Sequence, residues 1–304
     1  MFSKYLATRA TAKRLNQHSQ QGVTLIELMV GIAVGLLVVA VAMGALMASR
    51  GISGTVSDTT GIQQQAAYAM RVIGQQLRQA GSLYLNLNNV AGQSSTIAAS
   101  MPVAFEASAA VSGSGNSFTP ASDTLTGTDT SLTVGYRRYT EAVFSSTTAQ
   151  SMVRNCLGGP ADTSTDQRLE SIFTFNSNSG TLQCGGNGAT AQPIMQNVAD
   201  FQVRYLLQDN STPGNTTIQY LAASDVGSGN WGKVQAVEVC LVLYGDEPID
   251  LPQGSSYTGC GNDSNTAKNK IDMTTLTGSR ARRMHIAFRN VFQLRSQGLI
   301  GTVL

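Results

Sequence analysis

The longest uninterrupted apolar stretch of the chain covers residues 28–49 and contains no charged residue. As a helix, these 22 residues would extend about 33 Å at roughly 1.5 Å per residue, which matches a bilayer hydrocarbon core of about 30 Å. A buried helix of a soluble protein would carry polar side chains along one face, and no such face is present here. We therefore expect a helix that spans a membrane over about 26–49.

A second apolar pattern has helical spacing and follows a stretch, 51–60, that we expect to be loosely ordered. Gly81 follows the pattern as a C-cap. The apolar positions recur three or four residues apart and are Ile62, Ala66, Ala69, Met70, Ile73, Leu77 and Ala80. The pattern predicts a long helix over 23–81 whose second half is the spine for the rest of the chain.

Beyond Gly81 the chain has short alternating runs of apolar and polar residues, which predict β-strands. These runs are 132–139, 171–175, 201–207, 234–244 and 284–294. We expect residues 107–130, rich in Ser, Gly and Thr, to form a surface loop. The predicted fold class is α+β, with a long N-terminal helix packed against an antiparallel β-sheet in a β-rich domain over 82–304.

Composition and charge narrow the function classes. Charged residues make up 12% of the chain and hydrophobic residues 42%, which excludes intrinsic disorder. The net charge of +2 includes four bases before Val23, and without them 16 basic residues face 18 acidic ones. Such a body has no basic face for nucleic acid, so we predict no direct nucleic-acid binding.

A basic segment followed by an apolar run also begins secretory signal peptides. The run here exceeds the roughly 7–15 residues of a signal core, and the small-residue cleavage candidate Ala40–Ala42 lies inside it. Glu27 stands at the membrane end of the run, where a carboxylate costs on the order of 2–3 kcal/mol and requires a partner. The basic residues before the run predict a cytoplasmic N-terminus and an external body.

The sequence Gly22-Val23-Thr24-Leu25-Ile26-Glu27-Leu28 closely resembles the class III signal of type IV prepilins and type II secretion pseudopilins. The resemblance implies that a prepilin peptidase removes residues 1–22 on the cytoplasmic side, by cleavage between Gly22 and Val23. It also implies that Val23 becomes the N-methylated terminus, while the apolar helix stays attached.

The resemblance gives Glu27 a role in assembly. A methylated amine stays cationic at neutral pH, so the N-terminus of a neighbouring subunit can neutralise this carboxylate inside an apolar filament core. Gly31 and Gly35 have the spacing that lets membrane helices approach closely, although glycine is also simply common in such helices.

Parts of the body resemble the PilW family of minor pilins. The segments are 77–81 at the end of the helix, 198–205, Trp231 with 234–239, and the basic run 280–283. This resemblance implies a single-pass inner-membrane protein with a periplasmic body that later joins a pilus at the cell surface. It implies a role in priming pilus assembly, in support of adhesion and twitching motility, with other minor pilins, the major pilin and a tip adhesin as partners.

Two alternatives remain open. A J-type pseudopilin of a type II secretion system shares the same helix and a similar sheet. An exported hydrolase with a conventional signal peptide would begin after Ala42 rather than at Val23.

Four cysteines lie in the part expected outside the cytoplasm, where disulfides persist. They allow three pairings, and we favour Cys156–Cys184 and Cys240–Cys260 because each closes one local loop. A zinc site would require closer spacing.

Catalytic and metal-binding motifs are missing from the sequence. It contains no GxSxG, HExxH, GxxxxGK[ST] or dinucleotide glycine pattern, so we expect no enzyme activity, no cofactor and no metal. We interpret His285 as an ordinary strand residue, 262–265 as a solvated turn rather than a calcium site, and Arg280, Arg282 and Arg283 as a solvated strand end.

Overall fold

The computed structural model describes residues 22–81, 85–86, 104–105, 117–118, 120–209, 215, 217–261 and 269–294. The chain divides into two compact units, residues 1–52 and residues 53–304. The 262–265 turn of the sequence analysis lies outside the described residues.

Helix α1 (Leu25–Gln79) contains 55 residues and contributes to both units. The prediction of a loose stretch over 51–60 is wrong, because these residues are helical. Each glycine here costs about 1 kcal/mol relative to alanine, but the helix continues into a segment whose packing in the main core stabilises it. The hydroxyls of Thr59 and Thr60 donate to carbonyls four residues earlier, at 2.8 Å and 2.9 Å.

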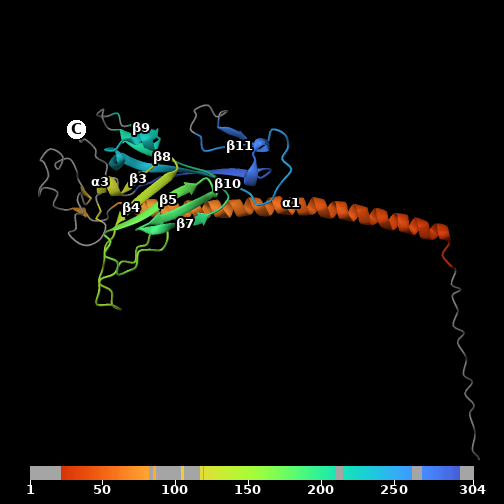
Figure 1. Ribbon diagram of the computed structural model, residues 1–304, viewed down its shortest axis with the longest axis horizontal. Coiled ribbons are helices and arrows are strands. Elements are labelled where there is room, and N and C mark those ends of the chain that lie inside the picture. The colour runs from red at the N-terminus through yellow and green to blue at the C-terminus, as the bar shows by residue number, and fades with distance from the viewer. Residues whose placement is uncertain are drawn as a thin grey trace, which may run out of the picture. The chain divides into compact units, whose positions relative to one another are not determined.

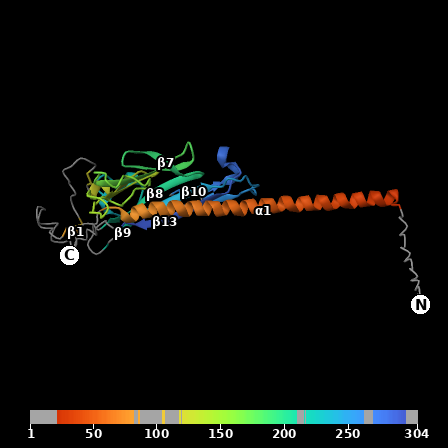
Figure 2. The same cartoon turned by 90° about the horizontal axis from the view of Figure 1, so that it is seen from below.

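Two antiparallel sheets form most of the second unit (Figures 1 and 2). The five-stranded sheet has the order β3-β4-β5-β6-β7, with strands β3 (Leu125–Gly127), β4 (Ser131–Arg137), β5 (Arg168–Asn176), β6 (Thr181–Gly186) and β7 (Ala189–Met195). The four-stranded sheet has the order β13-β10-β8-β9, with strands β13 (His285–Gln293), β10 (Val234–Tyr244), β8 (Val198–Asp209) and β9 (Thr217–Leu221).

Smaller elements complete the described fold. Two strand pairs are β1 (Leu85–Asn86) with β2 (Ala104–Phe105), and β11 (Ser256–Thr258) with β12 (Lys270–Asp272). The short helices are α3 (Pro120–Asp123), α4 (Ala223–Val226), η1 (Trp231–Lys233), η2 (Met273–Thr275) and η3 (Gly278–Arg280).

All five predicted strands occur, and the α+β class with a long helix against antiparallel sheet is confirmed. The single sheet that we expected is instead two sheets. The predicted loop over 107–130 is wrong for its described part, which contains α3 and β3. Leu125 is buried in the main core there, although its three-residue strand is too short to show alternation.

The second half of α1 is the spine of this unit, as its apolar pattern predicts. Ile62, Ala66, Ala69, Ile73 and Leu77 are all buried in the main core. Gly74 allows β13 to approach the helix, because a Cβ at this position would lie 2.5 Å from the Phe292 ring.

Gly81 ends the helical segment and joins it to the sheet. Its φ of 90° belongs to the left-handed region that glycine adopts at helix ends. Its N–H donates to the Gly135 carbonyl, and its carbonyl accepts from the Arg137 N–H, each at 2.8 Å. These two bonds attach the end of the helix to β4 in space, although α3 and β3 lie between them in the chain.

Candidate functional site

The predicted processing site precedes the first turn of α1. Gly22, Val23 and Thr24 lie immediately before the first helical residue, and all are exposed in their unit. The Gly22–Val23 bond therefore lies in exposed, non-helical backbone, which a peptidase can reach. Cleavage there and methylation of Val23 remain predictions.

Thr24 and Glu27 form a reciprocal cap at the start of the helix. The Glu27 N–H donates to the Thr24 hydroxyl at 3.3 Å, and the Thr24 N–H donates to Glu27 Oε2 at 3.4 Å. This is the capping box, a Ser or Thr followed three residues later by Glu or Gln. Our sequence reasoning assigned Glu27 only to assembly, although the Thr-x-x-Glu spacing before an apolar run already indicated the cap.

The cap leaves Glu27 available to a second partner. Its bonds to Thr24 lie near the 3.5 Å upper limit of hydrogen bonds, and the side chain is exposed. A cationic amine offers a stronger, charge-assisted bond than the Thr24 hydroxyl. The geometry is compatible with exchange of a local cap for an ion pair between subunits, and that pairing remains a prediction.

Gly31 and Gly35 lie on the apolar half of α1. A Cβ added at either position would meet no atom within 4 Å, so nothing within its own unit covers this strip of backbone. Their predicted role in helix packing depends on a second helix. Among the described residues, α1 is the one helix that is long and apolar enough to cross a membrane.

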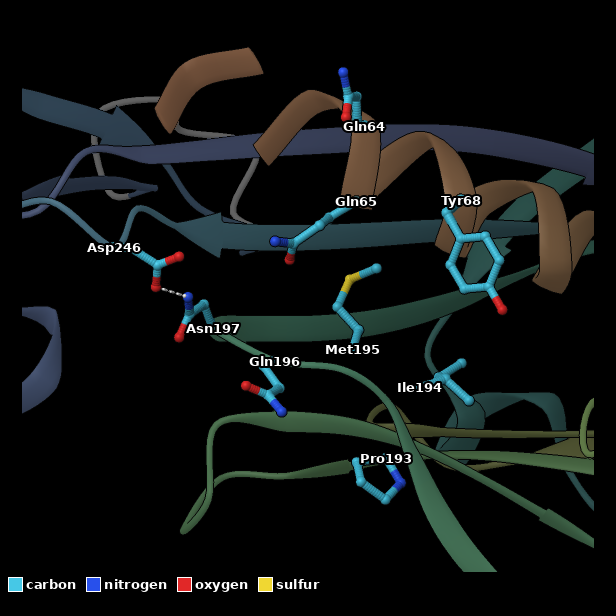
Figure 3. Close-up of a pocket in the computed structure, with 9 residues that line it drawn as sticks. All are labelled: Gln64, Gln65, Tyr68, Pro193, Ile194, Met195, Gln196, Asn197 and Asp246. Atoms are coloured by element: carbon cyan, nitrogen blue, oxygen red, sulfur yellow. Dashed lines mark hydrogen bonds between the residues drawn. The ribbon is translucent and has the colours of Figure 1, made fainter. Parts of the chain in front are cut away.

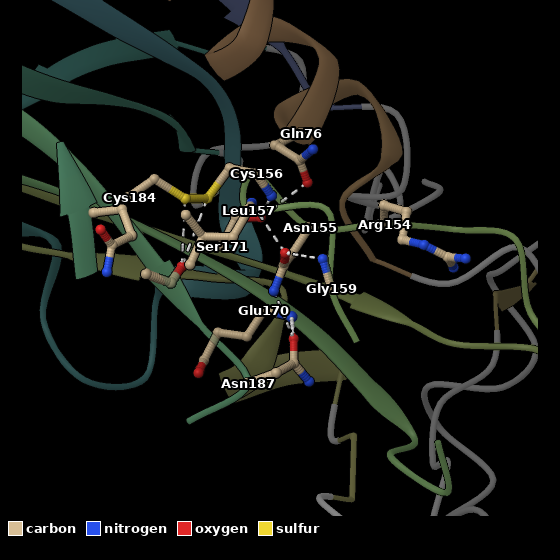
Figure 4. Close-up of a disulfide and its surroundings, with 12 residues drawn as sticks. Gln76, Arg154, Asn155, Cys156, Leu157, Gly159, Glu170, Ser171, Cys184 and Asn187 are labelled. Carbon is tan, nitrogen blue, oxygen red and sulfur yellow. Dashed lines mark hydrogen bonds between the residues drawn. A yellow bond between two sulfur atoms is a disulfide. The ribbon is translucent and has the colours of Figure 1, made fainter. Parts of the chain in front are cut away.

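The structure joins Cys156 to Cys184, which is one of the two local pairings preferred from the sequence. Figure 4 shows that this disulfide lies beside a buried polar network at the end of α1. The Ser171 hydroxyl donates to Gln76 Oε1 at 2.9 Å and accepts from the Cys156 N–H at 3.1 Å. The network therefore attaches the helix, β5 and the disulfide to one another.

Asn155, next to Cys156 in the chain, and Asn187 continue this network (Figure 4). Asn155 Oδ1 accepts from the N–H groups of Leu157 and Gly159, each at 3.0 Å, while its amide donates to Asn187 Oδ1 at 3.2 Å. The loop before β5 is thus held by side-chain hydrogen bonds in place of regular secondary structure.

The second disulfide, Cys240–Cys260, fastens the β11–β12 pair to β10. Cys240, Val242, Tyr257 and Cys260 form a small core of their own. This is the second preferred pairing, so both disulfides of the structure close local loops.

His285 belongs to the edge of this small core and is 4% exposed. Its ring stacks on Tyr257 with centroids 4.9 Å apart. Nδ1 donates to the Arg283 carbonyl at 2.9 Å, and Nε2 accepts from Arg280 Nε at 3.2 Å. Burial is the main cause that lowers the pKa of His285 to about 4, and the Arg280 charge lowers it further.

The interpretation of 280–283 as a solvated strand end is wrong for Arg280. Its guanidinium donates to the Tyr257 hydroxyl at 2.7 Å as well as to His285. Arg282 pairs with Asp250, and Arg283 donates to the Gly245 carbonyl at 3.0 Å. The basic run therefore connects the β11–β12 region to the start of β13.

The cavity in Figure 3 lies between α1 and the turn after β7, and its volume is about 460 Å³. Gln64, Gln65 and Tyr68 form its helical wall, and the Asn197 amide donates to Asp246 on the other side. Such a lining offers hydrogen bonds but pairs no nucleophile with a base. Among the described residues, no three His, Cys, Asp or Glu side chains are grouped to hold a metal ion.

Comparisons with known proteins find one family match in the N-terminal segment and another in the body. A family model described as Type IV Pilus-assembly protein W matches residues 172–296, and a model described as the prokaryotic N-terminal methylation motif matches residues 17–43. A comparison with curated proteins finds no match. Among solved structures, the chain is similar to a type IV-like pilin from Thermus thermophilus, with 12% identity, a TM-score of 0.33, and coverage of 77% of this chain and 96% of that chain.

The methylation motif contains Gly22, Val23 and Glu27, and the PilW match extends from β5 through β13. A methylation motif with an apolar helix indicates membrane anchoring and incorporation into a pilus. A pilin-type body indicates interaction with other pilins and with the enzyme that processes prepilins. Together the two matches support a type IV pilin of the PilW type.

Proposed function

We propose that this chain is a minor pilin that helps to initiate type IV pilus assembly. A prepilin peptidase cleaves between Gly22 and Val23, and the new N-terminus is methylated. The bases at Lys4, Arg9, Lys13 and Arg14, with no acid before Val23, favour a cytoplasmic leader and a periplasmic body. The mature protein leaves the inner membrane for the pilus at the cell surface.

Assembly depends on the apolar half of α1. Glu27 pairs with the N-terminus of a neighbouring subunit, and Gly31 and Gly35 let an adjacent helix approach. The partners are other minor pilins, the major pilin and a tip adhesin, and through them the protein supports adhesion and twitching motility. In this proposal the protein catalyses no reaction and needs no cofactor, and it acts by the packing of its helix against those of other subunits.

The observation that carries this proposal is the PilW match over 172–296. The N-terminal helix is common to pilins and secretion pseudopilins, so only the body separates the two. A J-type pseudopilin of a type II secretion system is the alternative that shares the helix.

A deletion strain tests the proposal. Loss of twitching with normal export of secreted enzymes is the expected result, whereas lost export with normal twitching would overturn it. Sequencing of the mature N-terminus tests the processing step, for which Val23 is the expected first residue and a start after Ala42 is the contrary result.

A further inference from the structure

A long arm connects β4 to β5 over residues 138–167 and is yellow-green in Figure 1. Arg138 organises its base and is only 2% exposed. The guanidinium donates to the carbonyls of Ala161 at 2.9 Å and Asp162 at 2.7 Å, and also to the carbonyl of Ser164. One buried side chain therefore fixes the returning half of the arm.

Further contacts attach the arm to the body. Gln79, the last residue of α1, donates to the Arg154 carbonyl at 3.4 Å. Arg154 forms an ion pair with Asp162, and the Cys156–Cys184 disulfide joins the arm to β6. The arm is thus held firmly although it contains little regular secondary structure.

The outer end of the arm is a turn over residues 142–149, which contains no charged residue. Glu141 and Gln150 exchange two backbone hydrogen bonds of 2.8 Å at its base. The turn presents Phe144, whose exposure reaches 110% of the reference value. Its fixed base reduces the conformational entropy that the turn would lose on binding.

A cavity of about 640 Å³ lies beside this turn. Its lining includes Tyr136, Tyr139, Val143 and Met152, and Met152 is itself 73% exposed. Glu141 is the one charged residue among those that line it. A projecting aromatic ring therefore lies next to a mainly apolar hollow.

We propose that the turn 142–149 and this cavity together form a docking surface for another protein subunit of the assembly, one that presents an uncharged apolar patch. Interface cores are rich in aromatic residues and methionine and poor in charge, and this surface has that composition. Neither the turn nor the cavity lining includes Lys or Arg, and the adjacent Arg137 guanidinium stacks over the Tyr139 ring, 5.3 Å from its centroid, so this surface suits anionic lipid or nucleic acid less well than a basic patch would.

The partner is a different subunit rather than a second copy. A symmetric pairing of two copies presents the same face on both sides, so a two-fold axis through the cavity rim would place the two Glu141 carboxylates close together, where like charges repel. The proposal rests on the proposed function in one respect, namely that the partner belongs to the same assembly.

Photo-cross-linking in the intact cell tests the contact. A p-benzoylphenylalanine residue replaces Phe144 in the full-length chain, and the matched control carries it in place of Ile218 on β9, which is 61% exposed. We expect one adduct from position 144, with a different protein that co-purifies with the assembly, and loss of that adduct when M152D is added. Three results would overturn the proposal. The first is no adduct, the second is equal adducts from both positions, and the third is an adduct only with a second copy, with lipid or with a protein outside the assembly.

Substitutions give an independent measurement. Because Phe144 is fully exposed, F144D should leave the unfolding temperature unchanged but lower incorporation into the assembly at least tenfold, whereas I218D should affect neither. Normal incorporation of F144D overturns this inference alone. If the deletion strain instead twitches normally while the adduct from position 144 persists, the proposed function fails and the docking surface stands.

Discussion

The two halves of α1 belong to one continuous helix but have opposite surroundings. From residue 22 to residue 51 every described side chain is exposed within its unit, including the large apolar residues Leu28, Ile32 and Leu36. In the second half the apolar stripe is buried, and Ile73 and Leu77 have no exposed area.

The difference lies in the source of stabilisation. The second half gains about 25 cal/mol for each square ångström of apolar area that its own body removes from water. The first half obtains no burial within its own unit, so a bilayer or neighbouring helices must provide it. The second half of α1 therefore stabilises the folded body, and the first half is suited to membrane insertion and assembly.

Matched aspartates in the two halves give the largest expected effect. I73D places an unpaired charge in the main core and should destabilise the body by at least about 4 kcal/mol, whereas I32D should leave body unfolding unchanged but disfavour membrane insertion by about 3 kcal/mol. Urea unfolding and membrane fractionation of the full-length protein measure the two effects. Equal destabilisation of the body by both variants would contradict the division.

Removal of either disulfide should be the next largest effect. The loops closed by Cys156–Cys184 and Cys240–Cys260 have sequence separations of 28 and 20 residues, for which the chain-entropy estimate is about 3–4 kcal/mol each. Paired Cys→Ala substitutions with thermal unfolding test this. A body that unfolds at the wild-type temperature without either bond would show that the bonds contribute little.

Ser171 should have a smaller effect. S171A leaves Gln76 and the Cys156 N–H without their shared partner, at a cost of about 1–2 kcal/mol. Ser177 is exposed, so S177A is a matched control that should stay within about 0.5 kcal/mol of wild type. If the two variants unfold alike, the buried network does not stabilise the end of α1.

His285 should affect stability only in acid. Its pKa is about 4 in the folded protein and 6.5 in the unfolded chain, so the unfolded state takes up the proton first as the pH falls. Stability should be unaffected above pH 6.5, decline between pH 6.5 and pH 4, and lose nothing further from this group below pH 4.

The H285F variant should flatten this decline when unfolding temperatures are followed across the same pH range. Arg280, Tyr257 and Asp200 influence one another in this region and are present in both proteins, so the difference between the two profiles reports the histidine. Parallel profiles would contradict the assignment.

Much of this fold could be predicted from the sequence because its signals are local. The 3- and 4-residue spacing from Ile62 to Ala80 located the buried stripe, and the alternation over 234–244 gave the bounds of β10 as the structure has them. The edge strand β7 was missed because its residues are mostly exposed and it shows no alternation.

The rest depends on tertiary contacts. Residues 51–60 were predicted to be loose, but local glycine propensity is a weak guide when the helix continues on both sides of the stretch. The arm over 138–167 has no periodic pattern, since it is held by the buried Arg138 side chain and by a disulfide to a strand distant in the sequence. The motif at Gly22–Glu27 could be recognised because all of its residues are close together in the sequence. The cap formed by Thr24 was overlooked.

Incorporation of the E27Q variant into pili tests the central claim most directly. Glutamine preserves the capping box with Thr24 but removes the charge, so helix start, membrane insertion and cleavage after Gly22 should all remain. We expect E27Q to accumulate in the membrane as mature protein that is absent from sheared fibres, while T24A, which keeps the charge, still enters them. Fibres that contain E27Q at the wild-type level would contradict the account.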